Sequence, residues 1–340
     1  MPPLYITRQG ARLRVLNNRI VAVVEETNEE LVSIPLGQVS QLALFGNIGL
    51  TTPAIGALLD AEIEVAFFTQ SGRFRGHLTG GLTPHVPLRR MQYQRLGEAD
   101  YVLEMAKGFV AAKLRHMSAL LRRHNRERQD EEISAAADRI QSGLAQVAGR
   151  QKMNSLRGVE GAASAAYFSG FRRLFAAEWR FSSRQRRPPP DPVNAMLSFG
   201  YTLLSQVAFG AVASVGLDPY AGFLHELVYN RPALGLDLVE EFRPVVDGIV
   251  LWCCNSGQVT PDDFSSNHEG KDDGHPGGVI LNDEGKRRFL QAYEQRLEQT
   301  FTHPERGQKL QLRQCILEQA RQVRRRILDG PPGYQGMGFR

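Results

Sequence analysis

Residues 222–244 read GFLHELVYNRPALGLDLVEEFRP, with His225 a short distance upstream of three carboxylates. The second half of this stretch is predicted to begin a helix. In that helix Asp237, Glu240 and Glu241 share one face, because they are spaced three and four residues apart. Three carboxylates on one face repel one another, so the pattern predicts a positive charge beside them.

That positive charge could come from Arg243 or from a divalent cation. A neutral imidazole together with two or three carboxylate oxygens suits Mn²⁺ or Mg²⁺ better than it suits a thiol-lined zinc site. The pattern therefore indicates a metal site. The alternative is a solvated helix face beside a structural histidine.

A further acid, Glu160, lies in the stretch 155–175, SLRGVEGAASAAYFSGFRRLF, where it is the only carboxylate. Glycines and alanines surround it. Such small residues let helices approach closely, so Glu160 is predicted to be partly buried. A buried carboxylate is unfavourable unless it is paired or bound to a metal. Either an ion pair with Arg157 or a metal ion would satisfy it.

Arginines alternate with aromatic residues after Glu160, up to a stiff run of three prolines at 188–190. Arginines clustered with aromatic rings are typical of a surface that binds nucleic-acid phosphates. A solvated helix end is the alternative. The arginines that we expect to contact DNA are Arg172, Arg173, Arg184, Arg186 and Arg187.

The composition is that of a soluble globular protein. The chain has 340 residues, 42% of them hydrophobic, and a modest formal charge of +5. Three cysteines without a CxxC spacing fit a reducing cytoplasm, and no signal peptide is evident at the start of the sequence. Residues 192–217 carry no charge and could span a bilayer, but their polar side chains and glycines favour a buried helix capped by Asp191. We therefore expect a cytoplasmic protein without a membrane segment.

The sequence changes character near residue 80 and predicts an α+β protein. Residues 1–80 are β-rich and predict a small sheet or sandwich that serves as a scaffold or dimer interface, because they hold no cluster of ligand-type side chains. Residues 81–97 are expected to form a linker, 98–330 a larger, mostly α-helical domain, and 331–340 a disordered tail.

Two local signals refine the β-rich domain. Asn17 and Asn18 are predicted to form a tight hairpin turn, because asparagine tolerates positive φ. Thr52 and Pro53 are predicted to open a short helix, with Thr52 as its N-cap.

Four motifs, in this order, resemble the CRISPR-associated endonuclease and integrase family (CRISPR-associated protein 1), the spacer-adaptation integrases. They are LRGVEGAASAAYF at 156–168, DPVNAMLSFGYTLL at 191–204, GFLHE at 222–226 and LDLVEEFRP at 236–244. The N-terminal LYITRQGARL, FGNIGLTTPAIGALL and TQSGRFRGHLTG are similar to the β domain of that family. The resemblance thus covers nearly the whole chain.

The resemblance implies a metal-dependent DNA endonuclease and integrase, which inserts DNA as new spacers into a CRISPR array through attack of a 3′-OH on a repeat phosphodiester. It implies Mn²⁺ or Mg²⁺ as the cofactor. The residues that it implies are Glu160, His225 and Glu240 as catalytic metal ligands, Asp237 as a supporting acid, and Asn194 as further support around the ligands. Arg157, the possible ion-pair partner of Glu160, is expected to support the ligands as well. Asn194 could instead contact DNA.

The resemblance also implies a homodimer joined through the β domains, double-stranded DNA as substrate, and a small partner, CRISPR-associated protein 2. The exchange of one phosphodiester for another needs no ATP, and the sequence has no GxxxxGK[ST] loop. Two other functions fit the same residues: a non-catalytic DNA-binding assembly subunit, and a general repair nuclease acting on branched DNA.

Overall fold

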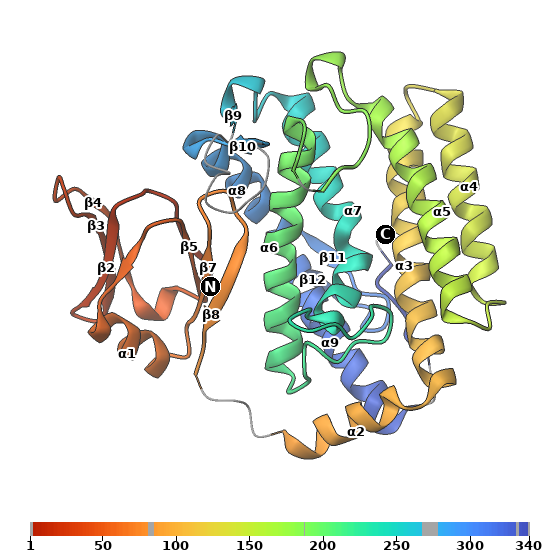
Figure 1. Cartoon of the computed structure of the whole chain (residues 1–340), viewed down its shortest axis with the longest axis horizontal. Coiled ribbons are helices and arrows are strands. Elements are labelled where there is room, and N and C mark those ends of the chain that lie inside the picture. Colours follow the sequence, from red (N-terminus) through yellow and green to blue (C-terminus); the bar gives the residue numbers. More distant parts are fainter. Residues whose placement is uncertain (1–2, 81–84, 187, 267–277, 331–332, 339–340) are drawn as a thin grey trace. The chain divides into compact units, whose positions relative to one another are not determined.

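The computed structural model describes residues 3–80, 85–186, 188–266, 278–330 and 333–338 (Figure 1). The chain divides into two compact units, Met1–Leu82 with Ile280–Lys286, and Thr83–Val279 with Arg287–Arg340. The first unit contains small β-sheets and the second is mostly helical. The predicted α+β class is therefore confirmed.

Two four-stranded sheets build the N-terminal unit, in the strand orders β4–β3–β2–β6 and β1–β5–β7–β8. Leu13, Ile20, Leu42 and Val65 are buried in the hydrophobic core that the two sheets share. The elements are β1 (Leu4–Ile6), β2 (Ala11–Leu16), β3 (Arg19–Val24), β4 (Glu30–Pro35), η1 (Leu36–Gln38), β5 (Gln41–Phe45), β6 (Gly49–Leu50), α1 (Thr52–Asp60), β7 (Glu64–Phe68) and β8 (Phe74–Leu78).

The hairpin between β2 and β3 turns at the two predicted asparagines. Asn17 and Asn18 have φ angles of 49° and 60°, which confirms the prediction. The predicted N-cap of α1 is wrong by one residue. Thr51 caps the helix, because its side chain accepts a hydrogen bond from the backbone N–H of Ala54 at 3.3 Å, and Thr52 already lies inside the helix.

Long helices dominate the chain from α2 onward, most of which belongs to the second unit; Ile280–Lys286, in β10 and the start of α8, belongs to the first. Figure 1 shows α3, α4 and α5 lying next to one another. Helix α3 also contacts α7, which packs on α6, so α3 lies against both α5 and α7. The elements are α2 (Val86–Leu96), α3 (Ala99–Asn125), α4 (Glu131–Val147), α5 (Met153–Phe171), η2 (Arg172–Leu174), η3 (Ala177–Trp179), α6 (Pro192–Ser214), α7 (Ala233–Ser256), η4 (Pro261–Asp263), β9 (Phe264–Ser266), β10 (Val279–Leu281), α8 (Asp283–Glu298), β11 (Thr300–Thr302), β12 (Lys309–Gln311) and α9 (Leu312–Asp329).

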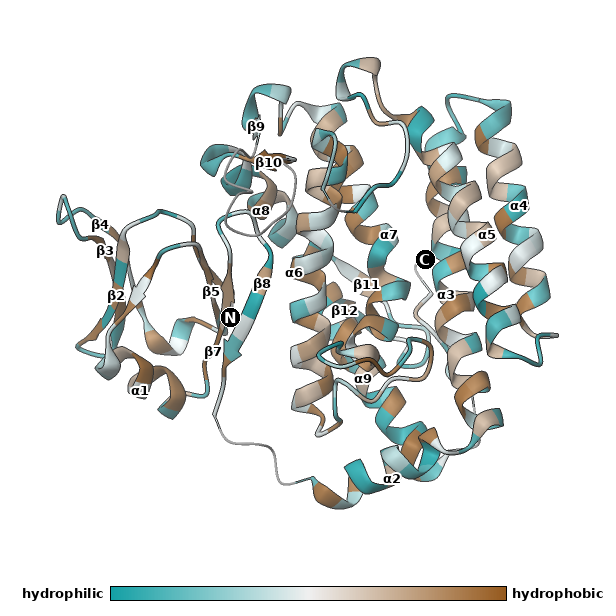
Figure 2. Cartoon of the chain, in the orientation of Figure 1, coloured by the Kyte–Doolittle hydropathy of each residue, from teal (hydrophilic) through white to brown (hydrophobic). Residues whose placement is uncertain are grey.

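Helix α6 is the uncharged helix that the sequence predicts. Asp191 caps it, accepting a hydrogen bond from the backbone N–H of Asn194 at 2.8 Å. Figure 2 shows mostly neutral to apolar colours along it. By length and composition α6 could cross a membrane, but 61% of its apolar window is buried inside the protein. Core helices of soluble proteins share this pattern, which supports the prediction of a buried helix.

The segment 81–97, expected as a linker, contains helix α2. Leu88 and Gln92 of this helix are buried. The Gln92 side-chain amide donates to the backbone carbonyls of Asp218 at 3.0 Å and Ala221 at 2.9 Å. The helical unit therefore begins with α2 rather than at residue 98.

The prediction of a disordered tail over 331–340 is wrong for residues 333–338. Tyr334 and Met337 are buried, and the Tyr334 ring packs 4.3 Å from that of Phe109 on α3, centroid to centroid. A Cβ atom on Gly108 would collide with the Tyr334 carbonyl oxygen, so this glycine makes the close approach possible. Residues 331–332 and 339–340 lie outside the described residues.

Candidate active site

Glu160 lies on α5, half-buried as predicted, and its partner comes from α3. Its Oε1 accepts hydrogen bonds from the Lys113 ammonium and from Ser164 Oγ, the latter at 2.9 Å. The alternative partner, Arg157, faces elsewhere. It forms an ion pair with Glu226 at 2.6 Å and donates to the carbonyl of Leu224 at 2.9 Å. Arg157 thus holds the chain on either side of His225.

Glu240 lies on α7 with 4% of its surface exposed. Its Oε1 accepts a hydrogen bond from Arg243 Nε at 2.8 Å, which confirms the predicted positive charge. Its Oε2 lies 2.6 Å from Lys113 Nζ. Burial alone would raise the pKa of Glu240, but the neighbouring charges of Arg243 and Lys113 outweigh it and lower the pKa. Glu240 is therefore a carboxylate at neutral pH.

Asp237 folds the chain around His225. It is fully buried, and its oxygens accept the backbone N–H groups of Phe223 at 2.6 Å, Leu224 at 2.9 Å and His225 at 2.9 Å. His225 Nδ1 lies 2.7 Å from Asp237 Oδ1. A carboxylate only accepts hydrogen bonds, so Nδ1 carries a proton, and in the neutral imidazole Nε2 then has the free lone pair.

His225 Nε2 is directed toward Glu240, with 3.8 Å between Nε2 and Glu240 Oε1. A hydrogen bond from a ligating imidazole to a second carboxylate is the usual way in which proteins orient a metal-binding histidine. Both oxygens of Asp237 are already occupied by the loop that it supports. The geometry therefore favours Glu240 over Asp237 as a direct ligand.

Lys113 is the residue that the sequence analysis missed. It lies on α3, 47 residues before Glu160, and only 7% of its side chain is exposed. Its spacing could have revealed it. Lys113 stands four residues after Phe109 and four before Met117, both buried, so it lies on the apolar face of the helix. A lysine on the apolar face of a helix needs a buried carboxylate as a partner. Here it has two.

Glu160, Glu240 and His225 are the types of side chain that bind a divalent cation. Two carboxylates share one cationic partner, and the imidazole nitrogen faces one of them. Buried Glu240 Oε2 has the Lys113 ammonium as its partner, at 2.6 Å. Among the described residues no three His, Cys, Asp or Glu side chains form a metal-binding group as they stand. The lysine ammonium lies between the two acids.

Glu241 departs from the prediction that the three acids of α7 share one face. It is fully buried and turned toward the segment 333–338, where Met337 donates its backbone N–H at 2.8 Å. Burial raises the pKa of Glu241 to about 7, although hydrogen bonds from Tyr334 and the Met337 N–H oppose the rise. Glu241 therefore belongs to the packing around the site.

Asn194 connects to the site through Arg184. It is fully buried, and its Oδ1 accepts from Arg184 Nη1 at 2.9 Å. The guanidinium of Arg184 lies 5.4 Å from the ring centre of Tyr201, and that of Arg243 lies 4.5 Å from the same ring. Arg243 in turn binds Glu240. Asn194 therefore helps to order two arginines, Arg184 and Arg243, beside the carboxylates.

The other arginines predicted to contact DNA differ in their surroundings. Arg172 and Arg186 are exposed, whereas Arg173 is paired with Asp130 at 2.7 Å and Glu132 at 3.3 Å. Arg187 lies outside the described residues. The interleaved aromatic side chains pack inward, and Phe175 and Phe181 meet edge to face at 5.4 Å, so these rings are not available to stack on bases.

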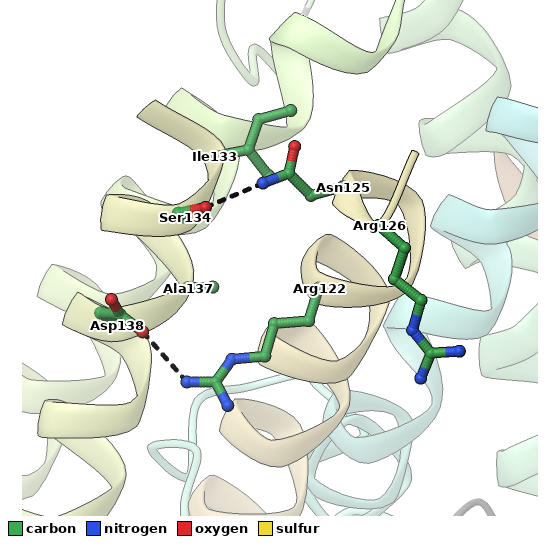
Figure 3. Close-up of a pocket in the computed structure, with 7 residues that line it drawn as sticks. All are labelled: Arg122, Asn125, Arg126, Ile133, Ser134, Ala137 and Asp138. Atoms are coloured by element: carbon green, nitrogen blue, oxygen red, sulfur yellow. Dashed lines mark hydrogen bonds and ion pairs between the residues drawn. The ribbon is translucent and has the colours of Figure 1, made fainter. Parts of the chain in front are cut away.

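A separate pocket of about 260 Å³ lies between the end of α3 and the start of α4 (Figure 3). Asn125 donates to Ser134 across it at 2.9 Å, and Arg122 pairs with Asp138 at 3.0 Å. It is lined by Arg122, Asn125, Arg126, Ile133, Ser134, Ala137 and Asp138. It includes no residue that the sequence predicts for the site.

A sequence model of the family described as CRISPR associated protein Cas1 matches residues 4–295. The chain is 40% identical over 326 residues to a CRISPR-associated endonuclease Cas1 of Thermus thermophilus, and the match covers 96% of each protein. It is 35% identical over 341 residues to a CRISPR-associated exonuclease Cas4/endonuclease Cas1 fusion of Geobacter sulfurreducens. That match covers 98% of this chain and spans 59% of the fusion.

Solved structures share the fold. A casposase bound to an integration product matches with a TM-score of 0.83 at 23% identity, covering 96% of this chain and 90% of that one. A chain of a Cas6-RT-Cas1–Cas2 complex matches with a TM-score of 0.82 at 24% identity, covering all of this chain and 36% of that one. At these identities the similarity concerns the fold alone.

Proposed function

The chain belongs to the Cas1 family, and on that premise we propose that it is a divalent-metal-dependent DNA endonuclease and integrase that inserts DNA fragments as new spacers into a CRISPR array. The observation that carries the proposal is that Glu160 and Glu240 both contact the Lys113 ammonium, which brings the two carboxylates together. His225 Nε2 lies 3.8 Å from Glu240 Oε1. The Thermus thermophilus relative, named an endonuclease and covered almost end to end, supports the same activity.

Glu160, His225 and Glu240 are the side chains that would hold Mn²⁺ or Mg²⁺. Such an ion, when bound, neutralises charge on the phosphate oxygens and makes a hydroxyl a better nucleophile. Asp237 holds His225 in the tautomer that presents Nε2. Arg243 keeps Glu240 ionised and in place. These two residues act through the ligands and are positioning residues.

The reaction is the exchange of one phosphodiester for another. The 3′-OH of the incoming DNA attacks a repeat phosphorus, a new P–O bond forms, and the bond to the repeat 3′ oxygen breaks. The proton lost by the attacking hydroxyl is balanced by the one that the leaving 3′ oxygen takes up. No bond energy from ATP is required.

The assembly that we propose is a homodimer in the cytoplasm, joined through residues 1–80, which binds double-stranded DNA and the small partner CRISPR-associated protein 2. A similar fold in a solved Cas6-RT-Cas1–Cas2 complex is compatible with that partner. Arg172 and Arg186, both exposed, are available to contact phosphates, and Arg187 is proposed with them.

A strand-joining assay tests the function. The full chain is incubated with labelled duplex DNA and a supercoiled plasmid that carries a CRISPR repeat, in Mn²⁺, in Mg²⁺ or in EDTA, with and without the small partner. We expect label to become covalently attached to the plasmid only with a divalent ion. Duplexes ending in a 3′-deoxy sugar are the matched control, because they lack the nucleophile.

Two results would point to the other functions. Equal DNA binding in EDTA with no joining or cleavage in Mn²⁺ indicates a non-catalytic assembly subunit. Cleavage of branched DNA without joining indicates a repair nuclease.

A further inference from the structure

Lys113 is enclosed by the groups that are proposed to bind metal. Its ammonium donates to Glu160 Oε1 and lies 2.6 Å from Glu240 Oε2, and the side chain is 7% exposed. Helix α3 supplies it and contacts both α5 and α7, which supply the two acids. The lysine therefore joins three helices at the point where the carboxylates meet.

The charges of Glu160, Glu240 and the two basic side chains that contact them balance without a metal ion. Glu160 and Glu240 contribute two negative charges, and Lys113 and Arg243 contribute two positive charges. Mg²⁺ bound by the same oxygens would lie about 2.0–2.1 Å from them. The ammonium, 2.6 Å from Glu240 Oε2, leaves no room for such an ion beside that oxygen on the same side. The two cations cannot occupy the same place, and they repel each other at low dielectric.

We propose that Lys113 is a built-in competitor for the metal ion: its ammonium holds Glu160 and Glu240 together in the metal-free protein and must be displaced when a divalent ion binds. This inference rests on the proposed function, because it concerns the same site. The lysine acts on the site in two ways. It keeps two buried acids satisfied in the metal-free protein, and it weakens metal binding by the free energy needed to break its ion pairs.

Lys113→Met tests the proposal, because methionine keeps most of the side-chain volume and removes the charge. Lys107→Met is the matched control. Lys107 lies on the same helix and also has a carboxylate partner, Glu104 at 2.6 Å, but it does not touch the site. Mn²⁺ affinity is measured on the full chain without DNA by isothermal titration calorimetry, and the melting temperature is measured in EDTA and in Mn²⁺.

We expect Lys113→Met to bind Mn²⁺ about tenfold or more tightly than the wild type, the change that corresponds to the loss of one modest ion pair. We expect its melting temperature to be lower than that of the wild type in EDTA and to recover in Mn²⁺. Lys107→Met should match the wild type in Mn²⁺ affinity. Mn²⁺ affinity of Lys113→Met equal to or weaker than that of the wild type would overturn the proposal.

Lys113→Arg covers the case in which the methionine variant does not fold. It keeps the positive charge, so its Mn²⁺ affinity should not exceed that of the wild type, and a tighter-binding arginine variant contradicts the proposal. Failure of this inference can be told from failure of the proposed function. A wild type that joins DNA with Mn²⁺ while Lys113→Met binds Mn²⁺ no more tightly loses only the inference. Absence of Mn²⁺ binding in every variant removes both.

Discussion

Tyr334 donates its phenolic hydrogen to the carboxylate of Glu241, which joins the segment 333–338 to the residue directly after Glu240. Gln319 of α9 completes the cluster, donating to Tyr334 Oη at 2.6 Å. Helix α7 therefore presents adjacent carboxylates to different surroundings, Glu240 to the cations of the site and Glu241 to the C-terminal segment. The segment 333–338 is thus part of the support of the site.

The segment 333–338 should detach when Gly108 is given a side chain. We expect Gly108→Ala to lose about 1–3 kcal/mol of unfolding free energy, because its Cβ would overlap the Tyr334 carbonyl oxygen. Gly143→Ala is the control, since its Cβ would meet no atom closer than 3.6 Å and alanine favours a helix. Urea denaturation and limited proteolysis measure the two effects. Equal stability of the two variants would contradict the importance of this packing.

Removal of any proposed ligand should abolish joining. We expect Glu160→Ala, His225→Ala and Glu240→Ala each to lower Mn²⁺-dependent strand transfer by about a thousandfold or more, and the triple variant to lose little beyond that, because the three act as one unit. DNA binding should persist, as a gel-shift assay can show. Near-normal joining by a folded Glu160→Ala or His225→Ala protein would disprove the site.

Asp237→Asn should have an intermediate effect. The substitution turns one acceptor oxygen into a donor that faces His225 Nδ1 or the backbone N–H groups. We expect strand transfer to fall by about 10–100-fold, as is usual when the partner of a metal-binding histidine is altered. Mn²⁺ affinity should fall with it. A variant with wild-type Mn²⁺ affinity would show that Asp237 does not orient His225.

Asp247 should make stability depend on pH. Burial raises its pKa to about 6 from 3.8, although its hydrogen bonds with Tyr201 and Tyr167 oppose the rise. Between these values the folded protein binds more protons than the unfolded chain, so stability falls as the pH rises from about 4 to 6. Compared with Asp247→Asn, the wild type should lose up to about 3 kcal/mol over that window. Urea denaturation measures the unfolding free energies. A difference between the two proteins that stays the same at every pH would exclude this titration.

Salt dependence separates the exposed arginines from the paired one. If Arg172 and Arg186 bind phosphates, their joint replacement by Ala should flatten the slope of log K against log salt by about 0.9 for each phosphate that the variant no longer neutralises. Arg173→Ala should change the slope less, because Asp130 and Glu132 already neutralise that charge. Fluorescence anisotropy at several salt concentrations gives the slopes. An unchanged slope for the double variant would show that neither arginine contacts DNA phosphates.

The local parts of the structure could be read from the sequence because neighbouring residues decide them. The turn at Asn17 and Asn18 follows from their tolerance of positive φ, and the start of α6 follows from the Asp191 cap. The grouping of His225, Asp237 and Glu240 was also predictable. They lie within 16 residues, and helical periodicity puts the two acids on one side of α7. The family motifs indicated Glu160 as the third ligand, a role that stays a prediction.

Only the tertiary structure decided which charges meet. Lys113 stands 47 residues from Glu160 in sequence, so its contact with that acid depends on how α3 packs against α5 and α7. The same packing turns Arg157 toward Glu226 instead of Glu160. Glu241 looks like its neighbour Glu240 in the sequence, yet a helix rotates successive side chains by about 100°, which carries it into a different environment. Sequence spacing determines the face of a helix, and packing determines what that face meets.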